Sequence, residues 1–300
     1  MTADAKTPRF HDRGCRWVVL SRMVIPALIM VLWSTAAWGY LFNGAHLLEL
    51  MTRTLEGAKS LIVTQHLTIE DPLISAQPVE MREELKYFFP DRFRSEIRHA
   101  DFQRILVVSR GAALTIADGR ITAFSEGRFE RYKDLLLYRS RKLLHKALLR
   151  YGVDTGITSL GRMGTRVVYV IGAQYPDDAV SQLWIDKERL LPLRWLSVLS
   201  ANGLDQQVSR LEFIYANWIQ SDKVWYPMRI EALYNGRRMR TLEVSSVQAN
   251  APIARELFNI ANLMMMYTVA EEPQSGAGNS NSAVDEVERT IEEFRRELDP

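Results

Sequence analysis

Segments in which apolar and polar residues alternate recur along most of the chain, and they limit it to a fold built mainly of antiparallel strands. Residues 91–99 show the pattern most clearly, because Phe93, Ser95 and Ile97 alternate with charged residues, as in a half-buried strand. Similar segments cover residues 79–89, 102–109, 112–118, 120–125, 165–173, 180–186, 191–201, 206–218, 223–234 and 238–248. Asn235-Gly236 between the last two is a strong signal for a hairpin turn. We therefore predict a mostly β fold with some helix and about 11 strands.

The charged run Asp186-Lys187-Glu188-Arg189 lies between two apolar segments that each contain a tryptophan. Such a run belongs either to a catalytic site or to a turn between strands. A catalytic cluster needs convergent groups from elsewhere in the chain, and no motif supplies them, so we interpret the run as an exposed hairpin turn. Pro192 lacks a backbone N–H and predicts an edge position or a β-bulge just after it.

Two segments have helical periodicity instead. Residues 45–60 place Leu47, Leu48, Met51 and Leu55 on one face, and Gly57 suits the end of that helix. Residues 132–151 predict a helix of about five turns with one apolar stripe. The stripe contains Leu136, Leu143, Leu144, Ala147 and Leu148, and the opposite face carries Arg139, Arg141, Lys142, Lys146 and Arg150. Residues 152–164, rich in Gly and Thr, predict a loop.

The N-terminal region indicates export. Residues 1–39 hold the excess of positive charge, and the run from Met23 to Phe42 contains no charged residue. Residues 1–39 are therefore predicted to be a signal peptide or, alternatively, a membrane anchor. Both alternatives place the rest of the chain outside the cytoplasm. The single cysteine, Cys15, precedes the apolar run, so disulfides and thiolate chemistry are excluded from the exported part.

The C-terminal region differs in composition from the part before it. Residues 40–270 predict the folded domain, and residues 271–283 form a Gly/Ser/Asn-rich flexible linker. Residues 284–300 predict an amphipathic helix. Its apolar seam would contain Val284, Val287, Ile291, Phe294 and Leu298.

No motif for catalysis, metal binding or cofactor binding is present in the sequence. The five histidines are scattered, and no phosphate-binding loop, dinucleotide-binding glycine pattern or nucleophile elbow occurs. The formal net charge is +2, and its positive excess belongs to residues 1–39, which argues against nucleic acid as a partner. We predict a protein that is not an enzyme and needs no metal or cofactor.

Large apolar residues recur at inward positions of the predicted strands. They are Phe93, Ile97 and Val107 in the first half, and Phe213, Tyr215, Tyr226, Met228 and Ile230 in the second. One interpretation is the core of a β-sandwich, which such stripes usually form. The other is a curved sheet whose concave face holds an apolar ligand, with the 132–151 helix as its lid. In that case Leu136, Leu143 and Leu144 would face the ligand.

Five segments resemble the lipoprotein carrier superfamily of the bacterial periplasm. They are "YFFPDRFRSEI" (87–97), "LWIDKERLLPLRW" (183–195), "KVWYPMRIEALYNG" (223–236) and "VSSVQANAPIARELF" (244–258), together with "ILVVSRGAALTIADG" (105–119). The resemblance implies an unclosed antiparallel β-barrel with a helical lid over a hydrophobic cavity that takes acyl chains. It implies no chemistry and no cofactor. The carrier of that family has a basic residue before the hairpin proline, where this chain has Phe89.

The resemblance implies two alternative functions. The first is a periplasmic carrier or chaperone for lipids or lipoproteins, which would receive acyl chains from an inner-membrane transporter or pass them to an outer-membrane acceptor. The second is a lipid-sensing regulatory or interaction protein of the cell envelope. Burial of acyl carbons would drive loading in either case, at about 0.8 kcal/mol per CH₂.

Overall fold

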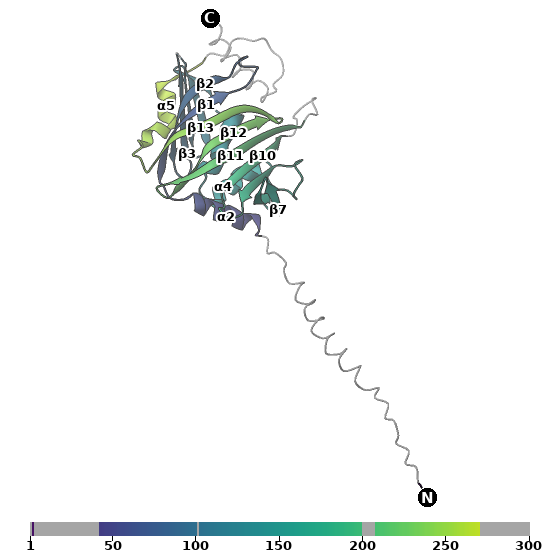
Figure 1. Cartoon of the computed structure of the whole chain (residues 1–300). Coiled ribbons are helices and arrows are strands. Elements are labelled where there is room, and N and C mark those ends of the chain that lie inside the picture. Colours follow the sequence, from purple (N-terminus) through teal and green to yellow (C-terminus); the bar gives the residue numbers. More distant parts are fainter. Residues whose placement is uncertain (1, 3–41, 101, 200–207, 271–300) are drawn as a thin grey trace. The chain divides into compact units, whose positions relative to one another are not determined.

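One sheet of 14 strands dominates the computed structural model, which describes residues 2, 42–100, 102–199 and 208–270 (Figure 1). The strands are β1 Ser60–Ile69, β2 Val79–Phe88, β3 Arg92–His99, β4 Phe102–Ser109, β5 Ala112–Ala117, β6 Arg120–Ala123, β7 Thr158–Met163, β8 Arg166–Ile171, β9 Gln182–Asp186, β10 Pro192–Leu199, β11 Ser209–Ser221, β12 Val224–Tyr234, β13 Arg237–Ala249 and β14 Thr268–Val269. Their order in the sheet is β14-β6-β5-β4-β3-β2-β1-β13-β12-β11-β10-β9-β8-β7.

The sheet consists of two antiparallel meanders that meet at one seam. Strands β1 to β6 form the first meander and β7 to β13 form the second, and β1 pairs with β13 at the seam. Only the short β14 pairs in parallel, with β6. The strands β14 and β7 end the sheet on its two sides without pairing with each other in the described part of the chain. The predicted fold class, an unclosed antiparallel β-barrel, is confirmed.

The sheet has more strands than the sequence predicts. β7 lies in residues that were expected to form a loop, because Gly161 in its middle is typical of loops. The glycine is needed for another reason: a Cβ atom at this position would lie 2.5 Å from Cδ2 of Tyr175, whose ring packs against the strand. A glycine inside a strand often marks such a close approach.

The two predicted turns are confirmed. The Oδ1 atom of Asp186 accepts hydrogen bonds from the backbone N–H groups of Glu188 and Arg189, both at 2.9 Å, which closes the turn between β9 and β10. A register shift occurs between Pro192 and Arg194, so the proline marks a bulge rather than a sheet edge. Asn235 and Gly236 both have positive φ, at 50° and 78°, as the predicted two-residue turn requires.

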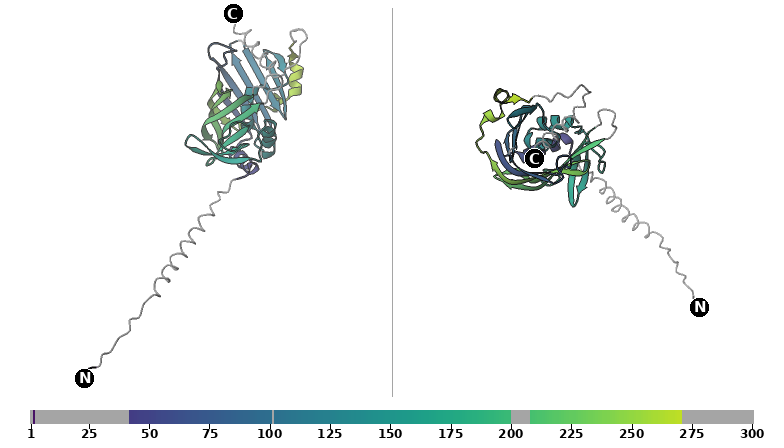
Figure 2. Two further views of the ribbon diagram at one scale, coloured as in Figure 1. Left: turned by 90° about the vertical axis from the view of Figure 1, so that its right-hand side faces the viewer. Right: turned by 90° about the horizontal axis from the view of Figure 1, so that it is seen from above.

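The helices divide between the two faces of the sheet. They are α2 Gly44–Leu55, the 3-10 helix η1 Arg128–Lys133, α3 Asp134–Leu137, α4 Arg141–Arg150, the 3-10 helix η2 Arg255–Phe258 and α5 Ile260–Met266. Viewed from above, the teal helices between β6 and β7 lie inside the curve of the sheet, and the yellow α5 lies outside it (Figure 2). We call these two sides the inner face and the outer face. Among the described residues, no helix has both the length and the apolarity that a membrane crossing requires.

Helix α2 agrees with its sequence prediction. The side chain of Asn43 caps it by accepting a hydrogen bond from the backbone N–H of His46 at 2.8 Å. The four predicted apolar residues are all buried: Leu47, Leu48, Met51 and Leu55. Apart from Thr2, residues 1–39 lie outside the described residues, as do residues 271–283 and 284–300, and the domain boundaries proposed there stay predictions.

Candidate functional site

Most of the predicted site residues on the strands lie together on the inner face. Directly opposite residues of antiparallel strands share a face of the sheet. Tyr87 therefore lies on the same face as Phe93, and Phe213 lies on the same face as Ala232. The inner face carries the predicted Phe93, Ile97, Phe213, Tyr215, Tyr226, Met228 and Ile230. All are buried except Met228, which is half-buried.

Val107 is the exception, and its prediction is wrong. It pairs with Arg94 and Leu114, which lie on the outer face. There it belongs to an apolar cluster with Ile105 and Phe258, beneath η2 and α5. Residues 105–108 are all apolar because both faces of β4 are covered, so alternation could not distinguish the inner from the outer positions.

The lid helix predicted over residues 132–151 is not continuous. η1 ends at Lys133 and is followed directly by α3, which ends at Leu137. α4 begins only at Arg141. Between them Tyr138 has φ −81° and ψ 82°, and Ser140 is extended, so neither residue can continue a helix. We call residues 128–150 the helical segment. Of its predicted contact residues, Leu136 and Leu144 are buried and Leu143 is half-buried.

Arg139 lies at this break. It is buried, so the prediction that it belongs to an exposed basic face is wrong. Its side chain is 8% exposed. The guanidinium carbon lies 3.7 Å from the ring centre of Phe89, and Nε donates to the backbone oxygen of Leu136 at 3.2 Å. Burial lowers the pKa of Arg139 to about 10. The break after Leu137 therefore turns this arginine toward the sheet.

Ion pairs anchor η1 to the inner face. Oε1 of Glu130 lies 3.1 Å from Arg104 on β4 and 3.1 Å from Arg240 on β13. Burial alone would raise the pKa of Glu130, but the two arginines outweigh burial and lower it to about 2. Lys133, fully buried, pairs with Glu126 and with Asp134. These ion pairs fix the η1 end of the helical segment.

Aromatic contacts continue the attachment. The hydroxyl of Tyr215 donates to the backbone oxygen of Tyr132 at 2.8 Å, and the Tyr132 ring packs edge-on against Phe213. Further along the inner face, the hydroxyls of Tyr87 and Tyr226 form a hydrogen bond of 3.0 Å. These contacts combine apolar rings with satisfied hydroxyl groups, as buried tyrosines require.

Glu83 on β2 is a buried carboxyl group that the sequence prediction missed. It accepts hydrogen bonds from Gln65 at 2.6 Å and from Ser95 at 2.5 Å. Burial raises the pKa of Glu83 despite these donors. The available signal was its inward position in the alternation of residues 79–89, on the side opposite Glu84.

Several buried polar atoms around the helical segment have no hydrogen-bond partner. Among the described side chains they are Gln65 Oε1, Glu130 Oε2, Arg131 Nη1, Arg139 Nη1 and Trp195 Nε1. All belong to the helical segment or to strands that face it. Buried polar groups are usually paired, so their concentration in one place distinguishes this region from the rest of the protein.

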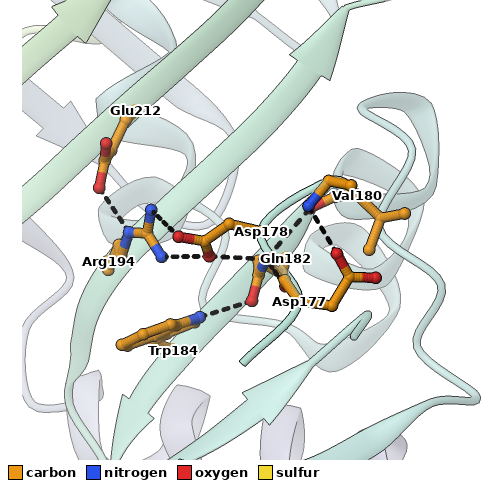
Figure 3. A network of polar contacts seen from close by, with 8 residues as sticks. Asp177, Asp178, Val180, Gln182, Trp184, Arg194 and Glu212 are labelled. Atoms are coloured by element: carbon orange, nitrogen blue, oxygen red, sulfur yellow. Dashed lines mark hydrogen bonds and ion pairs between the residues drawn. The ribbon is translucent and has the colours of Figure 1, made fainter. Parts of the chain in front are cut away.

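A second polar network lies on the outer face, and its groups are paired (Figure 3). Arg194 on β10 contacts Glu212 and makes two hydrogen bonds to Asp178, at 2.8 and 3.2 Å. Its guanidinium also lies 4.6 Å from the ring centre of Trp184, whose Nε1 donates to Gln182 at 2.7 Å. This network fixes the loop before β9 onto the sheet and leaves no group directed at a ligand.

Within the ranges that the structure describes, no three histidine, cysteine or carboxylate side chains are grouped as metal ligands. The polar groups of the inner face are instead engaged in holding the helical segment. The inner face therefore offers an apolar and aromatic surface, a helical cover with a break, and a few buried polar atoms without partners.

No family model and no curated protein matches the sequence. The fold is similar to that of an outer membrane lipoprotein-sorting protein domain from Vibrio parahaemolyticus, at 13% identity and a TM-score of 0.48, over 73% of this chain and 97% of that one. It is also similar to a LolA-superfamily protein from Nitrosomonas europaea, at 12% identity and a TM-score of 0.46, over 74% of this chain and 100% of that one. Both comparisons concern the fold alone.

Proposed function

We propose that this protein is a periplasmic carrier that holds the acyl chains of a lipid or lipoprotein against the inner face of its sheet. The observation that carries the proposal is the helical segment, which covers an apolar and aromatic surface but is interrupted at residues 138–140. An uninterrupted core helix would cover that surface permanently. A broken one has a natural hinge, because two non-helical residues absorb the change in direction.

The two ends of the helical segment suit different roles. η1 is held by the buried ion pairs of Glu130 and Lys133. α4 contacts its surroundings through apolar groups, with Leu144, Ala147 and Leu148 buried. In this proposal η1 stays in place, α4 moves away from the sheet, and acyl carbons replace its leucines on the inner face. Apolar contacts are not directional, so they can be exchanged for acyl chains at small cost.

The proposal is tested by comparing two leucines of α4. Leu144→Asp places a carboxylate at a buried position, and Leu149→Asp places one at a position that is 51% exposed. We expect Leu144→Asp to reduce the affinity for a fluorescent fatty-acid probe about tenfold or more, and Leu149→Asp to leave it unchanged. Ile230→Asp on the sheet should behave like Leu144→Asp. Lipids extracted from the purified wild-type protein and identified by mass spectrometry give a measurement that needs no mutation.

The opposite result would identify a plain core. In that case Leu144→Asp would lower the free energy of unfolding by roughly 3 kcal/mol or more, and the wild-type protein would neither bind the probe nor carry lipid. An export assay of the full chain, by fractionation of cells, tests the compartment separately.

A further inference from the structure

Arg139 differs from every other buried cation in the described part of the chain. The buried basic side chains there are Arg94, Lys133 and Arg139. Arg94 pairs with Glu96 at 2.7 Å, and Lys133 pairs with Asp134 at 3.0 Å. Arg139 forms no ion pair among the described residues, although the Glu56 carboxylate acts on its charge from a greater distance, and its Nη1 atom has no hydrogen-bond partner. A buried charge is normally paired, so an arginine in this state is suited to receive an anion.

The surroundings of Arg139 place it where the aromatic surface of the inner face ends. Its guanidinium covers the ring of Phe89, at the turn between β2 and β3. The Phe89 ring stacks on Tyr87 with ring centres 6.0 Å apart, and Tyr87 packs edge-on against Tyr226. The Tyr87 and Tyr226 hydroxyls are paired with each other. A cation with a free donor and two hydroxyl groups therefore lies at one end of a continuous apolar surface.

We infer that Arg139 binds the anionic headgroup of the acyl-chain ligand, through Nη1, while the chain lies along the inner face. The inference rests on the proposed carrier function and adds the chemical class of the ligand. An amphiphile with one negative charge fits, because its chain matches the rings and its headgroup supplies the missing counter-ion. A guanidinium suits both possible headgroups, a carboxylate and a phosphate, since its planar donors match the oxygens of either.

The cation–π contact with Phe89 also supports a ligand role. It orients the guanidinium without neutralising it, so the positive charge is kept in place for a partner. The hydrogen bond from Nε to the backbone oxygen of Leu136 uses one donor and leaves Nη1 free. Because the same bond connects Arg139 to the break in the helical segment, binding at the arginine would be coupled to movement of the cover.

The test compares ligands that differ only in the headgroup. Dodecanoate, dodecyl phosphate and methyl dodecanoate are titrated against the wild-type protein, with displacement of a fluorescent acyl ester as the readout. We expect at least one anionic ligand to bind about 10- to 100-fold more tightly than the ester, which is the range for a charge-assisted hydrogen bond in a buried site. Preference for dodecanoate indicates a free fatty acid, and preference for dodecyl phosphate indicates a phospholipid. Inorganic phosphate alone should not displace the acyl ester.

Variants then connect that preference to the arginine. Arg139→Gln should reduce the ratio of the affinity for the preferred anionic ligand to the affinity for methyl dodecanoate, the acid-to-ester ratio, to near 1. Its affinity for the ester should be kept, which also shows that the variant is folded. Arg139→Lys should retain part of the ratio. Arg141→Gln is the matched control, because Arg141 begins α4 and its side chain is 56% exposed. It should leave the ratio at the wild-type value.

Two results separate this inference from the proposed function. Equal binding of acid and ester by the wild-type protein, or an unchanged ratio in Arg139→Gln, overturns the headgroup site and leaves the carrier function standing. Absence of binding of all three amphiphiles overturns both. If Arg139→Gln does not fold, the acid-to-ester ratio of the wild-type protein and that of Arg139→Lys still test the headgroup site.

Discussion

The two polar networks of the sheet differ in what surrounds them. On the outer face, Arg194 shares its donors between Glu212 and Asp178, and the side chain of Asp178 is 45% exposed. On the inner face, Glu130 and Lys133 are buried, and several polar atoms nearby have no partner. The outer network is complete and close to water, so its role is to hold a loop. The inner one is buried and incomplete, and the proposed ligand site is our explanation for its unpaired atoms.

The difference lies in the cost of breaking each network. A surface ion pair exchanges its partner for water at little cost, whereas a buried charge that loses its partner has nothing to replace it. Breaking the inner network is therefore expected to lower the free energy of unfolding more than breaking the outer one, although the inner network contains the unpaired atoms. Three sets of variants test this contrast.

The largest effect on the free energy of unfolding is expected when one cation on each face is replaced by methionine, which is uncharged and of similar length. Lys133→Met leaves Asp134 buried without a partner and should lower the free energy of unfolding by about 3–5 kcal/mol. Arg194→Met leaves Asp178 and Glu212 within reach of water and should cost about 1 kcal/mol. Urea unfolding of both variants at neutral pH measures the two values. Equal losses would mean that the two networks do not differ as described.

Acid should weaken the inner network through Glu130. The folded pKa of this carboxyl group is about 2, below its ordinary value of 4.5. A lowered pKa adds stability that is fully present above pH 4.5 and is lost as the pH falls toward 2, in total about 3 kcal/mol. Glu130→Gln should be less stable than the wild type at pH 6, and the gap should narrow progressively in urea unfolding at pH 4 and pH 3. A gap that does not depend on pH would contradict the charge interaction with Arg104 and Arg240.

The smallest effect concerns one hydrogen bond. Trp184 on the outer face donates from Nε1 to Gln182, whereas Nε1 of Trp195 on the inner face has no partner. Trp184→Phe and Trp195→Phe remove the same atoms and leave an aromatic ring at each position, so the N–H group is the main difference between them. We expect Trp184→Phe to cost about 1 kcal/mol more than Trp195→Phe in chemical unfolding. A larger loss for Trp195→Phe would show that its N–H group is satisfied in solution.

Alternation in the sequence assigned the two faces of a strand correctly where its outward residues are charged. β3 is such a strand, and its inward residues Phe93 and Ile97 were assigned correctly. The method failed where both faces are covered, as in β4, because Val107 and its neighbours are all apolar. It also failed at β7, where the glycine is required by the ring of Tyr175 rather than by a turn.

The site was only partly predictable, since its polar groups meet across long stretches of chain. Glu130 joins Arg104 and Arg240, which come from opposite meanders, and no local spacing marks such a cluster. Arg139 was assigned to an exposed face by helical periodicity, which assumes an unbroken helix. The break after Leu137 changed its direction. The available signal was Ser140, which occupies the N-cap position of α4 and is a residue type preferred there.

The seam between β1 and β13 has a consequence for the synthesis of the chain. Lys59 donates a backbone hydrogen bond to the side chain of Asn250 there, across 191 residues. Every other antiparallel pair joins strands that follow one another in sequence, so each of them can form as soon as its own two strands are available. β1 must wait for nearly the whole domain to be made. Until then it presents an unpaired edge next to an uncovered apolar face, and the newly made chain is most vulnerable to aggregation just before its last long strand arrives.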